Sequence, residues 1–162
     1  MALNDVTIVE SAGATVREYA QEANTTILAG EPVKLGGTGG NYVLRLADGD
    51  PETGTDRMVG ISVSTGTATA SANGVVRVLE VIPGKTVMRC KATTAANIDT
   101  AAKLLGVRYD SVCFDLTSTT FTVDEDEGDD PNVHGLMIRD GDIAAGTIDF
   151  MLNEGAAAGG LV

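Results

Sequence analysis

The stretch from Met58 to Ala92 limits most strongly what this chain can fold into. Three runs within it alternate apolar and polar residues or are rich in β-branched residues: Val59 to Val63, Val75 to Val81 and Thr86 to Ala92. A period of two residues is that of a β-strand. Asn73-Gly74 and Pro83-Gly84 separate the runs and suit tight reversals. The stretch therefore predicts an antiparallel meander of three strands, whose apolar face packs on flanking segments or on another copy of the chain.

The second of these runs carries apolar residues on both of its faces. Val76, Val78 and Glu80 share one face, and the alternate residues point to the other: Val75, Arg77, Leu79 and Val81. Strands with Val or Leu on both sides are typical of sheet interiors. We therefore expect this strand to be central and Val78 to be buried.

The rest of the chain predicts further short strands and one helix. Residues 25–35 predict a strand, a turn at Gly30 and Pro32, and a second strand. Further strand patterns occur at 42–47, 107–116, 119–123, 135–139 and 146–152, with loops at 36–40 and 48–54. The helix is expected between Thr93 and Leu105, capped by Asn97 or Asp99 and ended by Gly106. A length of 162 residues is enough for one domain with its own core. The predicted fold class is mainly β: a small antiparallel β-barrel domain with one short helix.

The two ends of the chain are less regular than its middle. Val6 to Val9 is strand-like, and Ala14 to Ala23 could form two helical turns or an extended arm. Residues 1–24 are therefore either an arm that only a partner holds in place or an ordinary first strand. Residues 155–162 are mostly Gly and Ala, which predicts a flexible tail. We expect an extended N-terminal arm (1–24), a barrel domain (25–154) and a flexible C-terminal tail (155–162).

The charge balance excludes two classes of partner. With 23 acidic and 11 basic residues the net charge is −12, which repels both nucleic acid and anionic membranes. No run of 18 apolar residues is present, and the first residues lack the basic and apolar regions of a signal peptide. Synthesis in the cytosol without export is therefore expected. In that compartment Cys90 and Cys113 should be reduced, buried thiols.

Three features could carry chemistry, and each has a simpler structural explanation. Gly84-Lys85-Thr86 ends like a phosphate-binding loop, but position 79 is Leu instead of Gly and a strand follows. Residues 124–130 hold six carboxylates in seven positions without the EF-hand order, which favours a solvated acidic loop over a Ca²⁺ site. His134 is the only histidine, so no zinc ligand set exists, and no local signature supports a Cys–His nucleophile. We expect no catalytic residue, metal or cofactor.

One short segment is similar to an enzyme family. Ala145 to Phe150, with the sequence A-G-T-I-D-F, resembles the G-x-I-D segment of trimeric dUTPases, which are small β-proteins with glycine-rich C-termini. The resemblance implies that Asp149 would orient the attacking water. The serine-bearing phosphate motif and the aromatic-Arg-Gly segment of that family are missing here. Because only this segment matches, a dUTPase-like enzyme is kept as the alternative interpretation and not as the main one.

A longer part of the chain is similar to the decoration, or cement, proteins of tailed bacteriophages. Three segments within residues 25–92 follow the order found in the β-tulip type of decoration domain: Gly30-Glu31-Pro32-Val33, Met58-Val59-Gly60-Ile61-Ser62 and Gly74-Val75-Val76-Arg77-Val78. The resemblance implies a homotrimer on the outer surface of the virion capsid, which stabilises the shell by bridging neighbouring major capsid proteins. It implies no enzymatic activity. Another head or tail structural component remains an alternative within the same class.

The resemblance also implies an N-terminal arm that lies across neighbouring capsomers. Val6 to Val9 could bind by adding a strand to an exposed edge of a capsid sheet. The residues expected to contact the capsid are Val6, Thr7, Ile8, Val9, Val16 and Tyr19. Three arms on one trimer would raise the avidity about 10²–10⁴-fold over a single contact.

Overall fold

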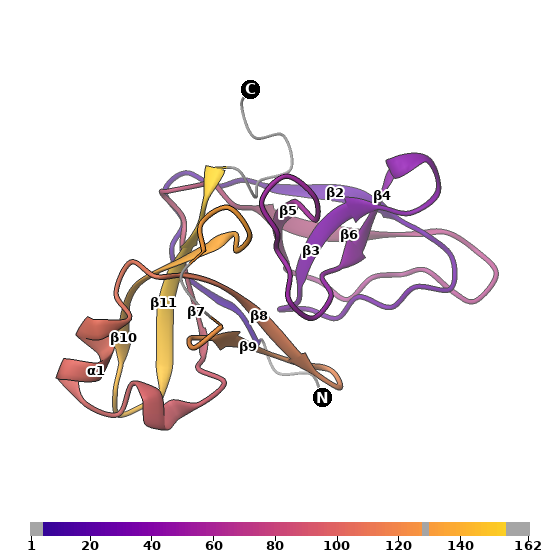
Figure 1. Cartoon of the computed structure of the whole chain (residues 1–162). Coiled ribbons are helices and arrows are strands. Elements are labelled where there is room, and N and C mark those ends of the chain that lie inside the picture. Colours follow the sequence, from indigo (N-terminus) through magenta and orange to yellow (C-terminus); the bar gives the residue numbers. More distant parts are fainter. Residues whose placement is uncertain (1–4, 128–129, 155–162) are drawn as a thin grey trace.

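The chain folds into a closed β-barrel and a six-stranded sheet that lie side by side (Figure 1). The computed structural model describes residues 5–127 and 130–154. The barrel has the order β2-β4-β3-β5-β6 and the sheet the order β1-β7-β11-β10-β8-β9. The barrel strands are β2 (Val16–Gln21), β3 (Pro32–Gly36), β4 (Tyr42–Arg45), β5 (Met58–Ser62) and β6 (Gly74–Glu80). The sheet strands are β1 (Thr7–Glu10), β7 (Val87–Lys91), β8 (Ser111–Thr117), β9 (Thr120–Asp124), β10 (Leu136–Asp142) and β11 (Thr147–Leu152).

The named helical elements of the described residues are short and lie between the strands. They are the 3₁₀ turns η1 (Thr38–Gly40) and η2 (Ala95–Asn97) and the helix α1 (Ala101–Gly106). The helix begins later than its sequence predicts, because Thr100 is its N-cap and accepts a hydrogen bond from the Lys103 amide. The expected caps Asn97 and Asp99 are thus wrong, whereas Gly106 does end the helix. The predicted fold class, mainly β with a barrel and one short helix, is confirmed.

The barrel is filled by β-branched side chains from its own strands and by Ile27, which precedes β3. Its core contains Ile27, Val33, Val43, Val59, Val76 and Val78. Gly60 of β5 allows the wall to close, because a Cβ at this position would lie 2.0 Å from the carbonyl oxygen of Leu79. Val76 and Val78 therefore point inward, as expected, but Val75 and Arg77 on the opposite face are exposed. Strand β6 is interior to the sheet order and buried on one face only.

The predicted three-stranded meander is correct for two strands and wrong for the third. Strands β5 and β6 pair antiparallel, with Ile61 opposite Leu79. The third strand, β7, instead pairs with β1 and β11 in the other sheet. The reason is that the free side of β6 is taken by β2, which pairs with it from Val16 to Gln21. Asn73-Gly74 is also not a tight turn, since the whole segment 63–73 connects β5 to β6.

The N-terminal region is built into both sheets. Strand β1 pairs with β7, and β2 closes the barrel between β4 and β6. Among residues 5–24 there is thus no separate arm, and the helical alternative for Ala14 to Ala23 is wrong. The alternative of an ordinary first strand describes this region. The expected tail at 155–162 lies outside the described residues.

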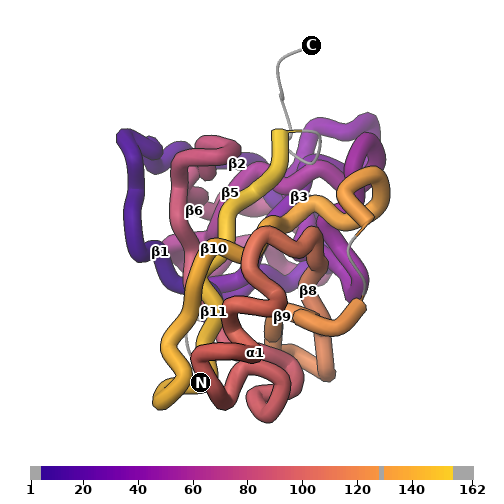
Figure 2. Tube along the Cα trace, turned by 60° about the vertical axis from the view of Figure 1, so that its left-hand side comes forward, coloured from indigo at the N-terminus to yellow at the C-terminus, as the bar shows by residue number. Residues whose placement is uncertain are grey.

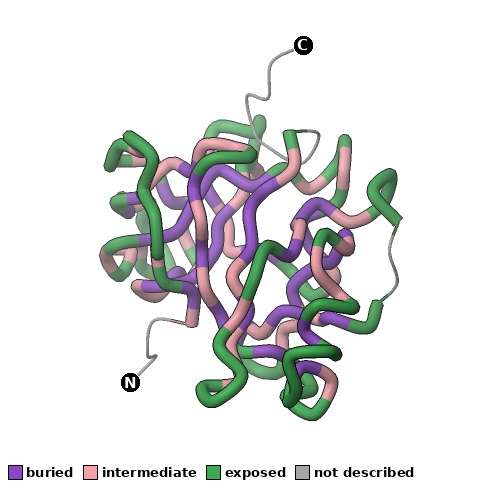
Figure 3. Tube along the Cα trace, turned by 90° about the vertical axis from the view of Figure 1, so that its left-hand side faces the viewer, coloured by how far each residue is buried: buried purple, intermediate pink, exposed green. Residues whose placement is uncertain are grey.

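The larger core joins the two β-structures. It is centred on Phe114, which packs edge-to-face on Phe121 and Phe150 with ring centroids 5.6 and 5.4 Å apart. Met58 and Ile61 of the barrel belong to the same core. Buried residues are concentrated along the strands inside the molecule, and turns and outer strands are exposed (Figure 3). The barrel and the sheet therefore form one packed unit.

Most of the other predicted elements are confirmed with shifted ends. The patterns at 42–47, 119–123, 135–139 and 146–152 correspond to β4, β9, β10 and β11. The pattern at 107–116 begins only at Ser111. Of the two strands predicted within 25–35 only the second forms, as β3, and the first is wrong. Cys90 and Cys113 are free and buried, as expected. Burial raises the pKa of each thiol to about 12, so both are inert in the folded protein.

Candidate interaction surfaces

The six residues expected to contact a partner are not equally available. Val6 is 1% exposed and belongs to the larger core, and Ile8 packs against that core. Tyr19 packs against the barrel core and donates its hydroxyl to Glu80. Burial and this hydrogen bond raise the pKa of Tyr19 to about 12. The remaining three residues, Thr7, Val9 and Val16, are exposed.

Strand β1 forms one edge of the six-stranded sheet and lies on the left of Figure 2. It is held by β7 on one side, with Ile8 opposite Met88. Its amino-terminal end is fixed because Asp5 accepts a hydrogen bond from the Phe121 amide at 3.2 Å. The pairing shifts by one residue at Val9, which is a β-bulge. This edge strand is short, and the side chains of Thr7 and Val9 are exposed on it.

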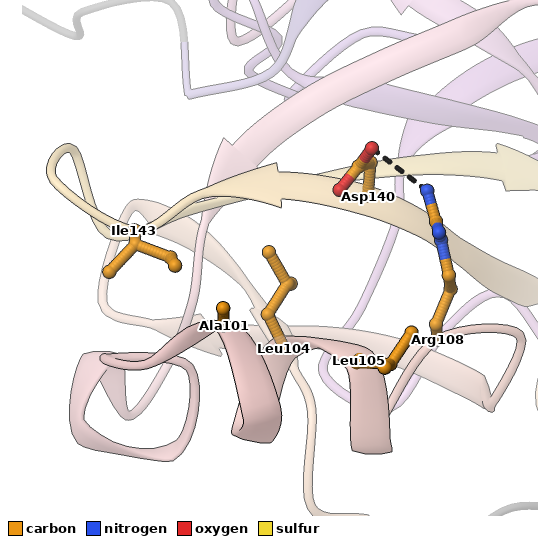
Figure 4. Close-up of a pocket in the computed structure, with 6 residues that line it drawn as sticks. All are labelled: Ala101, Leu104, Leu105, Arg108, Asp140 and Ile143. Atoms are coloured by element: carbon orange, nitrogen blue, oxygen red, sulfur yellow. Dashed lines mark hydrogen bonds and ion pairs between the residues drawn. The ribbon is translucent and has the colours of Figure 1, made fainter.

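A second surface lies at the end of the molecule farthest from the barrel, between α1 and the β10–β11 hairpin (Figure 1). It contains an open apolar groove of about 240 Å³. Figure 4 shows Leu104 pointing from α1 toward the strands and Arg108 reaching across to Asp140, 2.9 Å away. The residues that line the groove are Ala101, Leu104, Leu105, Arg108, Asp140 and Ile143. We call these residues, together with Tyr109 and Arg139, the α1 surface.

Tyr109 is the exposed aromatic residue of the α1 surface. Its φ of 73° is in the left-handed region, which bulky residues rarely adopt. The Tyr109 amide donates to the Ile138 carbonyl at 2.9 Å, which fixes the backbone there. The guanidinium groups of Arg108 and Arg139 lie 5.9 and 5.6 Å from the ring centroid, within the range of cation–π attraction. The ring is therefore held in place although more than half of the side chain is exposed.

The outer wall of the barrel is a third surface. Val16, Val63 and Val75 are exposed there on neighbouring strands and their extensions. Glu18 and Arg77 stand opposite each other between them. The side chains of this wall are scattered among charged residues, and single exposed apolar residues are normal on a protein surface.

The residues singled out for chemistry have structural tasks. The Thr86 hydroxyl accepts from the Ile82 amide at 2.9 Å, so Gly84-Lys85-Thr86 is a turn, and the strand β7 follows it. Glu125 of the acidic segment is buried and accepts from the amides of Thr93 and Thr94 at 3.1 and 3.0 Å. In residues 5–127 and 130–154, no group of three or more His, Cys, Asp or Glu residues is arranged to hold a metal ion.

The two other candidate side chains, Asp149 and His134, differ in their contacts. Asp149 lies in β11 and accepts two hydrogen bonds from Arg89 of β7. His134 is half-buried and lies beside Glu52 in an isolated bridge, and its Nδ1 has no hydrogen-bond partner within the described part of the chain. Among the described residues, no hydrogen bond joins His134 to Cys90 or Cys113. Cys90 instead donates a hydrogen bond to the Phe121 carbonyl at 3.1 Å.

The α1 surface was missed by reasoning from sequence. Leu105, Tyr109 and Ile143 belong to three different segments, and no local pattern joins them. The only local signal is Leu105 itself, because an apolar residue directly after the buried Leu104 must point away from the core side of a helix.

Comparison with known proteins gives no relatives. No protein-family model, curated protein or solved structure matches the chain. Within the described residues no helix is both long and apolar enough to span a membrane.

Proposed function

We propose that this protein is a structural virion component that binds the outer surface of a tailed-phage capsid as a homotrimer and stabilises the shell. The proposal rests on the sequence resemblance of residues 25–92 and on one structural observation. Thr86, Glu125 and Asp149 are engaged in structural hydrogen bonds, while exposed apolar or aromatic side chains lie at two separate surfaces: Val9 at the β1 edge, and Leu105 and Tyr109 at the α1 surface. A protein that bridges neighbours needs at least two such surfaces.

The contact with the major capsid protein is assigned to the β1 edge. An edge strand offers alternate backbone amide and carbonyl groups to a partner, and Thr7 and Val9 add exposed side chains beside them. This assignment replaces the free arm with a rigid strand. A rigid contact loses less conformational entropy on binding than a segment that orders only on the partner.

The stabilisation itself follows from mass action. A protein that binds the assembled shell but not the separate subunits shifts the equilibrium toward the shell. Three binding edges on one trimer make the second and third contacts intramolecular, which raises avidity about 10²–10⁴-fold. The net charge of −12 keeps unassembled copies soluble and suits a position outside the shell, away from packaged DNA.

The contact is tested with point variants, because deletion of residues 2–20 would remove β1 and most of β2. The probe is a set of undecorated shells assembled from the major capsid protein encoded in the same genome. Val9→Asp should reduce binding to these shells at least tenfold, since it places a charge at the edge. Val63→Asp is the matched control, because Val63 is equally exposed on the barrel wall (45% and 44%).

Circular dichroism first establishes that both variants are folded, so that a change in shell binding reports on the contact itself. Loss of shell binding in Val9→Asp alone supports the β1 edge. Equal binding by the wild type and Val9→Asp overturns this assignment, and absence of binding by the wild type overturns the proposed function.

A further inference from the structure

The α1 surface gathers exposed apolar residues from parts of the chain that are far apart in sequence. Leu105 is 65% exposed, Tyr109 57% and Ile143 38%. Leu105 and Ile143 line the same groove (Figure 4). Tyr109 adjoins it, because its ring lies 5.9 Å from the guanidinium of Arg108, which also lines the groove. Tyrosine and arginine are enriched among the anchor residues of protein interfaces, and both adjoin this groove. The surface thus combines projecting side chains with a cavity that can receive such side chains.

The projecting side chains are held in place before any partner binds. Arg108 Nε donates to the Arg139 carbonyl at 2.6 Å, and its Nη2 donates to Asp140 at 2.9 Å. These two bonds fix the guanidinium that lies against the Tyr109 ring. A preorganised anchor loses little side-chain entropy on association. Left-handed backbone at a bulky residue such as Tyr109 is a local strain of the kind that is concentrated at functional sites.

The local charge balance points to a second copy of this chain as the occupant. Two copies that each carry −12 repel each other over most of their surface. On and beside the α1 surface, three basic residues stand against four acidic ones, which leaves a local charge of only −1. The basic residues are Lys103, Arg108 and Arg139, and the acidic residues are Asp99, Asp110, Asp140 and Asp142. Contact at this surface therefore carries less like-charge repulsion than the overall balance of 23 acidic to 11 basic residues implies.

The mixture of charges is also self-complementary. Lys103 pairs with Asp99 at 2.8 Å, and Arg108 pairs with Asp140 at 2.9 Å, both on the exposed surface. Around a symmetry axis, the basic member of one pair can approach the acidic member of the pair on a neighbouring copy. A partner of strongly acidic or strongly basic character would find no matching field here.

We infer that the α1 surface is where copies of this chain pack against one another, with Leu105 and Tyr109 of one copy lying against the groove of the next. The inference deepens the proposed function, because it names the surface that forms the homotrimer. It separates the two tasks of the molecule: α1 holds the copies together, and the β1 edge binds the shell.

The test is the molar mass of the purified full-length protein without shells, measured by light scattering over a range of concentrations. Leu105→Asp and Tyr109→Ser are the test variants, and Val75→Asp on the barrel wall is the matched control. All three positions are exposed, so the far-UV spectrum of each variant should match that of the folded wild type. The wild type and Val75→Asp should be oligomers, and Leu105→Asp should be monomeric at the same concentrations. Tyr109→Ser should need at least tenfold more protein to associate.

Several results would overturn the inference. A monomeric wild type contradicts it, as does an unchanged mass for both Leu105→Asp and Tyr109→Ser. Loss of the oligomer in Val75→Asp alone moves the interface to the barrel wall. An intact oligomer of Leu105→Asp that no longer binds shells makes the α1 surface a shell contact instead. Because the mass is measured without shells, failure of the inference is distinct from failure of the proposed function.

Discussion

Arg89 on β7 and Asp149 on β11 stand directly opposite each other across two paired strands, and the guanidinium donates from Nε and Nη2 to both carboxylate oxygens at 2.6 and 2.8 Å. The hydrogen bond to Asp149 holds the pKa of the Arg89 guanidinium above its ordinary value. A carboxylate that is engaged on both oxygens, with its side chain 13% exposed, is poorly placed to orient a water molecule. The geometry gives Asp149 a structural task and weakens the dUTPase-like alternative.

The first prediction concerns this pair. Asp149→Asn should lower the free energy of unfolding by about 1–2 kcal/mol, because it removes a charge-assisted, two-point contact that is partly shielded from water. Urea denaturation measures the change. Asp140→Asn, which breaks the more exposed pair with Arg108, should cost about 0–1 kcal/mol. Hydrolysis of dUTP by the wild type that disappears in Asp149→Asn would contradict the structural role.

The second prediction concerns the barrel wall. Val78→Asp should cost about 3–5 kcal/mol, because Val78 is fully buried in the barrel core and the carboxylate would have no partner there. Val75→Asp, three residues earlier on the exposed face of the same strand, should change stability by about 0.5 kcal/mol. Thermal melting of both variants checks the contrast. Similar melting temperatures for Val78→Asp and the wild type would show that the inward face of β6 has been misassigned.

The third prediction concerns the closest approach of β5 to β6. Gly60→Ala should destabilise the protein by about 2–4 kcal/mol, since its Cβ would lie 2.0 Å from the backbone oxygen of Leu79 and the two strands would have to move apart. Gly106→Ala is the control, because no atom lies within 4 Å of a Cβ there. In the last turn of α1, alanine should be neutral or should stabilise by about 0.5–1 kcal/mol. A neutral Gly60→Ala variant would contradict the close contact.

The fourth prediction concerns pH. Burial, with the neighbouring carboxylates Asp126 and Glu127, raises the pKa of Asp124 from 3.8 to about 6. Because the folded state holds this proton more tightly than the unfolded state, its contribution to stability is greatest below pH 3.8 and is lost as the pH rises to about 6. Burial also raises the pKa of Asp5, Glu31 and Asp115, which adds to the same trend.

Melting temperatures measured between pH 3.5 and pH 7 test this linkage. Asp124→Asn should flatten the decline between about pH 4 and pH 6, because the variant has no proton to lose. Val63→Asn, which changes an exposed residue without removing a carboxylate, should leave the slope unchanged. An identical slope for the wild type and Asp124→Asn would contradict the assignment.

The sequence predicts local structure well and the pairing of distant segments poorly. The alternation of Val75 to Val81 is enough to predict β6, and its pairing with β5 follows because the two are neighbours in the chain. That β2 takes the other side of β6 depends on Val16 reaching Leu79, more than 60 residues away, and no turn signal encodes it. Over the described residues 5–24 there is no free arm, because β1 pairs with β7 and β2 pairs with β6. The expected meander fails because β2 occupies the side of β6 that β7 was expected to take.

The same limit applies to the candidate surfaces. Val9 was predicted as a contact residue from its strand pattern and is exposed at a sheet edge, but Val6 in the same run is buried under the loop before β3, where its amide donates to the Gly30 carbonyl. The grouping of Leu105, Tyr109 and Ile143 depends on how α1 packs on the β10–β11 hairpin. Tertiary packing of this kind leaves no periodic signal in the chain.

If the protein stabilises a shell by binding its outer surface, it must change the temperature at which undecorated shells are disrupted. This disruption temperature is therefore the decisive measurement. Shells of the major capsid protein from the same genome are heated with and without saturating purified protein, and disruption is followed by light scattering. The added wild-type protein should raise the disruption temperature, and Val9→Asp should raise it much less at the same concentration. An unchanged disruption temperature at saturating wild-type protein would contradict the proposed stabilisation.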